Sequence, residues 1–135
     1  MLRKVLWVIF AIILLLCAWI RLSPNPVEKW HVDPTVDYPK TQNNYQTLVA
    51  DIDQADLRRA LPAMQNERAI ILAGRPEDGF VTYEIRSPLL KFPDFLSAKL
   101  TDDGLHIYSR SRFGISDWGQ NKKRAQAWIE QLKAQ

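Results

Sequence analysis

The polar residues best suited to chemistry lie in two blocks of the chain. The larger block, residues 109–124, sets two glycines among serines, arginines, lysines and amides, where a predicted strand gives way to a predicted helix. A smaller block, residues 86–94, precedes it. Together the two blocks supply the candidate site residues Arg86, Ser87, Asp94, Ser109, Ser111, Arg112, Ser116, Asp117, Asn121 and Arg124.

Two kinds of chemistry suit these side chains. In the first, ion pairs lock the last helix onto the sheet, while serine and amide groups satisfy free backbone groups at the corner. These pairs would form among Arg86, Asp94, Arg112 and Asp117. In the second, hydroxyls, the Arg112 guanidinium and the first amides of the helix converge on a carboxylate, phosphate or sulfate. Asp117 argues against the second, because its carboxylate would take the place of the anion.

Catalysis is a weaker interpretation. Asp94 and Asp117 offer an acid–base pair for a hydrolase, and the block offers serine nucleophiles. A serine nucleophile needs a base within hydrogen-bond reach. The two histidines are His31, ahead of the predicted domain, and His106, on an outward-facing strand position. They lie too far apart in the sequence to indicate a metal site. We therefore expect no enzyme, no cofactor and no bound metal.

The charge balance excludes a broad nucleic-acid surface. The net charge is +3, but four of the 18 basic residues and one of the 15 acidic residues precede Trp30. Fourteen of each sign remain, and a neutral domain lacks the basic footprint that phosphate-backbone binding needs. We expect no nucleic-acid partner.

Hydrophobic periodicity predicts the elements that position the two blocks. The expected fold class is α+β: an antiparallel β-meander of three to five strands with one helix before it and one after. Strands are expected over residues 69–73, 80–86, 95–100 and 105–109, and helices over 54–64 and 118–134. Residues 45–52 fit a strand or an irregular segment, although their apolar spacing is also helical.

The pattern also predicts which residues face the core and which end the elements. Val81, Tyr83 and Ile85 alternate with polar residues and should face inward. Gly104 should close a hairpin. Asp53 should cap the first helix of the domain, and Ser116 or Asp117 the last.

The apolar run over residues 5–20 predicts a single N-terminal transmembrane helix. Arg3 and Lys4 precede the run and Arg21 closes it. The run would span roughly 24 Å, a little less than the hydrocarbon core of a bilayer. A cleavable secretory signal is the main alternative, although no small-x-small site follows. Lipidation at Cys17 is a lesser one, since Leu16 stands where a small residue is wanted.

The chain therefore divides into three predicted parts. Residues 1–21 form the predicted anchor, residues 22–44 a proline-rich linker that should hold the domain away from the membrane, and residues 45–135 the soluble domain. Trp30 and Tyr38 of the linker could also pack on the domain surface. The basic start slightly favours a cytoplasmic N-terminus, which would place the domain in the periplasm or outside the cell.

The 109–124 block resembles the C-terminal signature of domain-of-unknown-function family 1499, roughly R-S-x-S-R-x-G-x-S-D-x-G-x-N-x-x-R. The matching residues are Ser109, Ser111, Arg112, Gly114, Ser116, Asp117, Gly119, Asn121 and Arg124. The 86–94 block is similar to the family's second block, so the resemblance covers about residues 57–132. Tyr108 stands where the family often has arginine. The Asn-Cys-Val-Ser-Ser segment of many members has no counterpart here.

The resemblance implies an envelope-associated domain with no established activity. We expect a membrane-anchored envelope protein whose domain binds or scaffolds without catalysis. Its partner would be an unknown protein or a small anionic ligand. The second hypothesis is a carrier or receptor for a small anionic ligand or lipid headgroup, and the third is a hydrolase. A carrier should show a pocket lined by Arg86, Ser109 and Arg112, and a scaffold an exposed apolar patch.

Overall fold

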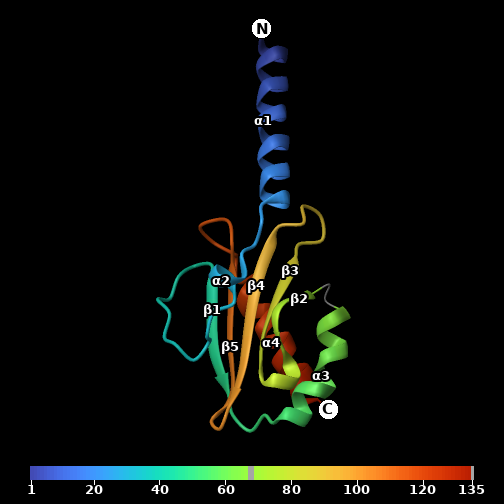
Figure 1. Cartoon of the computed structure of the whole chain (residues 1–135). Coiled ribbons are helices and arrows are strands. Elements are labelled where there is room, and N and C mark those ends of the chain that lie inside the picture. The colour runs from blue at the N-terminus through green and yellow to red at the C-terminus, as the bar shows by residue number, and fades with distance from the viewer. Residues whose placement is uncertain (67–68, 135) are drawn as a thin grey trace.

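A long helix projects from one end of a sheet-based domain (Figure 1). The computed structural model describes residues 1–66 and 69–134. In chain order the elements are α1 (Leu2–Leu22), α2 (Val27–Trp30), β1 (Asn44–Val49), α3 (Gln54–Asn66), β2 (Ala69–Arg75), the 3-10 turn η1 (Pro76–Asp78), β3 (Phe80–Arg86), β4 (Pro93–Thr101), β5 (Gly104–Ser111) and α4 (Gln120–Lys133).

The five strands form one antiparallel sheet in the order β1-β5-β4-β3-β2. Strands β2 to β5 are a meander in which each pairs with the next, and β1 pairs with β5 at the far edge. Helix α3 precedes the meander and α4 follows it. The predicted α+β class, with an apolar N-terminal helix, is confirmed. The ambiguous segment near residue 45 supplies the fifth strand.

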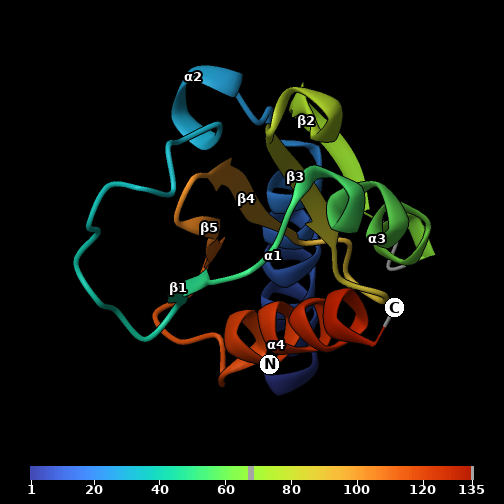
Figure 2. The same ribbon diagram turned by 90° about the horizontal axis from the view of Figure 1, so that it is seen from below.

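The core lies between one face of the sheet and the two helices α3 and α4 (Figure 2). Alternation along β3 turns Val81, Tyr83 and Ile85 into this core, as predicted, because successive strand residues point to opposite faces. Trp128 of α4 is 1% exposed and meets the Tyr83 ring edge-on, with ring centroids 5.3 Å apart. Truncating such a buried ring to alanine costs about 3–5 kcal/mol, so this contact is a main attachment of α4.

The other face of the sheet is covered by residues 23–43, which we call the covering segment. The segment does not hold the domain away from α1 as the predicted extended linker would. It contains the short helix α2 and lies on the side of the sheet opposite α4 (Figure 2). Its aromatic rings stack on rings that point outward from the strands: Trp30 on Phe95, His31 on Phe80 and Tyr38 on Tyr108, at centroid distances of 4.3, 4.1 and 4.3 Å.

Polar contacts fix the covering segment as well. Lys99 of β4 forms an ion pair with Asp33, with Nζ and Oδ2 2.5 Å apart. His31 Nδ1 lies 2.8 Å from the Thr82 hydroxyl, which in turn bonds the Ser97 hydroxyl at 2.8 Å. Thr82 and Ser97 are buried. The sheet is therefore enclosed on both faces, although sequence periodicity predicted a polar outer one.

The predicted turn and cap chemistry is present in the domain. Asp53 Oδ1 accepts the backbone N–H of Asp56, whose Oδ2 accepts the N–H of Asp53, both at 2.9 Å. This reciprocal pair satisfies amides at the start of α3. Gly104 closes the β4–β5 hairpin at a φ of 126°, and a Cβ there would lie 2.2 Å from the Val49 carbonyl oxygen. Both geometry and space require glycine.

Candidate functional site

The sheet separates the candidate residues into two groups on opposite faces. Asp94 of β4 lies opposite Ser111 of β5, so the two blocks do meet across neighbouring strands. Strand alternation turns Asp94, Ser109 and Ser111 toward α4, and Arg86 and Arg112 toward the covering segment. The expected pocket lined by Arg86, Ser109 and Arg112 is therefore not formed.

On the α4 side, Asn121 is the centre of a buried hydrogen-bond network. Its side chain is 0% exposed, and its Oδ1 accepts the hydroxyl of Ser109 at 2.7 Å. Its Nδ2 lies within hydrogen-bonding distance of three oxygens: Ser111 Oγ at 2.9 Å, the Asn43 carbonyl at 3.0 Å and Asp117 Oδ2 at 2.6 Å. The network joins α4, β5 and the end of the covering segment, and it satisfies polar groups that would be costly to bury alone.

Asp117 occupies the amides at the start of α4. Its Oδ1 accepts the N–H of Gly119 at 2.8 Å, and its Oδ2 accepts the N–H of Asn121 at 3.0 Å. The helix begins at Gln120, two residues later than predicted, because Trp118 and Gly119 have left-handed φ values of 54° and 78°. Asp117 thus performs the predicted capping role from a position before the helix. A carboxylate already fills the place that an anion would take.

Asp94 pairs with Arg124, with Oδ2 and Nη2 2.9 Å apart and both side chains about one-fifth exposed. It does not pair with an arginine of its own block. Arg124 also donates to Asn121 Oδ1 at 3.2 Å, which connects the ion pair to the buried network. Ser116 remains exposed and accepts the N–H of Trp118 at 3.2 Å.

On the opposite face, Arg86 and Arg112 hold the end of α1. Arg86 Nη1 donates to the carbonyl of Arg21 at 2.8 Å, and its Nε pairs with the buried carboxylate of Glu84. Arg112 Nη1 donates to the carbonyl of Pro24 at 2.8 Å and to the Asn25 side chain. Carbonyls at and beyond a helix C-terminus favour cationic donors. These two arginines therefore fasten α1 to the domain.

Arg110 continues this row of arginines along β5. Its guanidinium lies 4.5 Å from the centroid of the Trp30 ring, and Nη2 donates to the Lys29 carbonyl at 2.7 Å. Burial lowers the pKa of Arg110 below its usual range. Its contacts belong to the packing of the covering segment.

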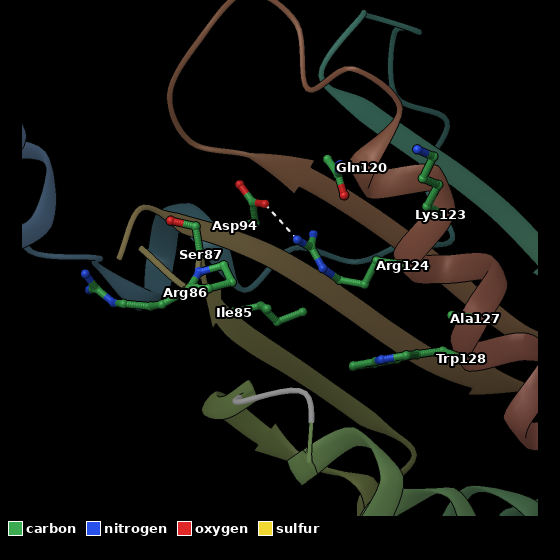
Figure 3. Close-up of a pocket in the computed structure, with 10 residues that line it drawn as sticks. Ile85, Arg86, Ser87, Asp94, Gln120, Lys123, Arg124, Ala127 and Trp128 are labelled. Carbon is green, nitrogen blue, oxygen red and sulfur yellow. Dashed lines mark hydrogen bonds and ion pairs between the residues drawn. The ribbon is translucent and has the colours of Figure 1, made fainter. Parts of the chain in front are cut away.

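A groove of about 660 Å³ lies between the end of β3, the start of β4 and the exposed side of α4 (Figure 3). Apolar groups from Ile85, Ala127 and Trp128 form part of its wall. The polar lining residues are Arg86, Ser87, Asp94, Gln120, Lys123 and Arg124. Arg124 reaches across to Asp94, whereas the side chain of Arg86 points away from them (Figure 3).

The site residues predicted from the sequence do not include Gln120, Lys123 and Trp128. Helical periodicity could have identified them, because residues 120, 123, 124, 127 and 128 lie on one side of a helix. Trp128 lines the groove, and its Nε1 is buried with no hydrogen-bond partner among the described residues. The hydroxyl of Tyr83, in the core, is likewise buried without a partner there. Burial raises the pKa of Tyr83 to about 12, so the hydroxyl stays protonated.

The arrangement of hydroxyls and histidines does not match nucleophilic catalysis. The two serines considered as nucleophiles are Ser111 and Ser116: Ser111 Oγ accepts from Asn121 Nδ2 at 2.9 Å and Ser116 Oγ accepts the Trp118 N–H at 3.2 Å, so both hydroxyls have structural partners. His31 lies on the other face of the sheet, and burial lowers its pKa. Among residues 1–66 and 69–134, no group of three or more His, Cys, Asp or Glu side chains could hold a metal ion.

Comparison with known proteins places the chain in a family. No curated protein matches it. The model of the family described as protein of unknown function (DUF1499) matches residues 21–132, which confirms the resemblance and extends it upstream through the covering segment. That extension agrees with the packing of residues 23–43 on the sheet. The chain belongs to the DUF1499 family.

Proposed function

We propose that this chain is a membrane-anchored, non-catalytic binding protein whose groove takes the anionic head of a small amphiphilic ligand. One observation carries the proposal: an apolar wall that includes Trp128 lies beside a rim that carries Lys123 and Arg124. The volume of about 660 Å³ is in the range of small-molecule sites. Such a site suits an apolar body that ends in a carboxylate or phosphate.

The charges of the groove favour one anionic group. Arg124 is neutralised by Asp94, and the guanidinium of Arg86 is directed elsewhere and pairs with Glu84. Lys123 forms no ion pair within the described part of the chain, so it supplies the surplus positive charge. The indole N–H of Trp128, which has no partner among the described residues, offers a further donor to a ligand that enters the wall.

Helix α1 supports the anchoring part of the proposal. It is 21 residues long, and an 18-residue stretch of it has a mean hydropathy of 2.7. Most of its side chains are exposed. At about 1.5 Å per residue it spans roughly 31 Å, which matches a hydrocarbon core of about 30 Å. Arg3, Lys4 and the terminal amine favour a cytoplasmic N-terminus and an extracytoplasmic domain. Impermeant thiol labelling of Asp103→Cys in intact cells, in a Cys17→Ala background, tests that orientation.

The binding test uses the full chain in phosphatidylcholine nanodiscs with ¹⁵N-labelled tryptophan. Butyl phosphate should shift the indole resonance of Trp128, and inorganic phosphate should bind more weakly because it leaves the apolar wall uncovered. Lys123→Gln should weaken butyl phosphate about tenfold, as expected for the loss of a charge-assisted contact. Lys122→Gln is the matched control, because Lys122 is equally exposed but does not line the groove.

Two outcomes would contradict the proposal. One is an unshifted Trp128 resonance at millimolar butyl phosphate. The other is an equal response of the Lys122 and Lys123 variants. A second arm identifies the source of the anion: a shift that appears when phosphatidylglycerol replaces part of the phosphatidylcholine, without added ligand, identifies the ligand as a lipid headgroup.

A further inference from the structure

Two loops at the α1 end of the domain expose large apolar side chains. Residues 87–92 connect β3 to β4, residues 112–119 connect β5 to α4, and both project toward the anchor (Figure 1). We call them the tip loops. Their apolar side chains are strongly exposed: Leu89 88%, Leu90 46%, Ile115 90% and Trp118 88%. Loop tips in water are normally polar, so a patch of this kind indicates a partner.

Both tip loops contact the last turns of α1. The ring of Phe113 meets that of Trp19 edge-on at a centroid distance of 5.7 Å. Leu89 and Leu90 line a cleft together with the anchor residues Cys17, Ala18, Arg21 and Leu22. The tip loops therefore lie beside α1 rather than beyond its end.

The part of α1 that the tip loops contact sets the depth of these loops relative to the bilayer. Residues 17–22 cover about 8 Å of helix, similar to the depth to which interfacial apolar groups enter a bilayer. With α1 spanning the hydrocarbon core, its last turns lie at the boundary with the headgroups. Side chains that flank those turns then reach the same boundary.

The charges and the backbone of the tip loops suit this environment. Lys91 and Arg112 are basic, and the one acidic residue, Asp117, is turned inward to accept backbone amides. Trp118 holds a left-handed φ of 54° while its ring remains 88% exposed. That backbone conformation is costly for a bulky residue and gains no packing in water. Tryptophan is favoured at the membrane interface, where its ring gains an apolar environment.

We propose that the two tip loops insert Leu89, Leu90, Ile115 and Trp118 into the interface of the membrane that α1 spans, so that the domain lies directly on the bilayer. The inference rests on the anchoring part of the proposed function. It concerns a different surface from the groove, and it assigns the exposed apolar patch to lipid rather than to a protein partner.

The test measures lipid contact residue by residue in the full chain, reconstituted in phosphatidylcholine–phosphatidylglycerol vesicles. A fluorescent label is attached to Leu89→Cys or Ile115→Cys in a Cys17→Ala background, and lipids brominated either near the headgroup or deep in the acyl chains act as quenchers. Leu14→Cys reports on the anchor. Asp103→Cys, in the hairpin at the opposite end of the sheet, reports on a position in water.

Labels at 89 and 115 should be quenched as the label at 14 is, and the label at 103 should not. Trp118→Asp should reduce quenching at 115. Leu48→Asp, an equivalent change at an exposed leucine of β1, should not. Quenching at 14 alone overturns the membrane-docked orientation and leaves the anchor intact. Absence of quenching at 14 overturns both the anchor and this inference. If the labels at 89 and 115 escape lipid quenching but respond to protein density, the tip loops contact a second copy and the proposal is wrong.

Discussion

Asn121 shows how a residue of the family signature acts through structure. Its amide joins β5, α4 and the end of the covering segment, with no exposed surface of its own. Removing it leaves the buried Ser109 hydroxyl without its acceptor, whereas the Asn43 carbonyl keeps the backbone N–H of Ser111 at 2.9 Å. A buried group that loses its partner costs about 1–3 kcal/mol.

We therefore expect Asn121→Ala to lower the thermal midpoint of the domain by several degrees. The measurement is near-ultraviolet circular dichroism of the full chain in detergent micelles, which reports on the aromatic packing. Gln126→Ala, at an exposed position of the same helix, is the control and should melt like the wild type. A midpoint of Asn121→Ala equal to that of the control would show that the network does not stabilise the fold.

At the scale of elements, the covering segment is held to the sheet partly by the Asp33–Lys99 ion pair. The hydrogen bond from Lys99 lowers the pKa of Asp33 from 3.8 to about 2. A carboxyl whose pKa is lower in the folded state stabilises that state above its unfolded pKa. The contribution is therefore present at neutral pH, declines as the pH falls through 3.8, and is gone near 2.

Asp33→Asn should accordingly lower the unfolding midpoint at pH 7, and the difference from the wild type should vanish as the pH approaches 2. Urea unfolding of the full chain in micelles across this range measures it. In a Lys99→Gln background, Asp33→Asn should have little further effect. A difference that is independent of pH would show that the charge of Asp33 does not stabilise the folded state.

How much the sequence predicts differs from element to element. The strands of the meander and the amphipathic face of α4 follow from periods of 2 and 3.6, so their positions are predictable from local pattern. The cover over the outer face is predictable only in part: the sequence indicates that Trp30 and Tyr38 can pack on the domain, but not where they do so. It depends on Trp30, His31 and Tyr38 meeting Phe95, Phe80 and Tyr108, which are distant in sequence, and neither group shows a periodic signal.

The division of the candidate site has a similar cause. The sequence brings residues 86–94 and 109–124 together correctly, because neighbouring strands of a meander pair. It does not show that Arg86 and Arg112 face away from Ser109 and Asn121. With a side-chain period of two, one position along a strand decides the face, and the expected convergence ignored that alternation.

At the scale of the whole molecule, Arg86 and Arg112 fix the direction in which the domain extends from α1. Replacing both with glutamine removes the charged donors to the carbonyls of Arg21 and Pro24. We expect a broader distribution of distances between spin labels at Leu14→Cys and Asp103→Cys in nanodiscs, in a Cys17→Ala background. Arg75→Gln, at an exposed arginine of β2, should leave the distribution narrow. Equal widths in the two variants would show that the arginines do not orient the domain.

The packing of residues 23–43 on the sheet also determines the order in which contacts form during folding. These residues are synthesised directly after α1, whereas the rings that they cover belong to the later strands β3, β4 and β5. Strand β1 likewise cannot pair until β5 has been synthesised. Contacts between such distant parts of a chain form late in folding. The newly made protein therefore keeps Trp30 and Tyr38 exposed until its last strand has been synthesised, and exposed rings of this kind favour aggregation during the interval.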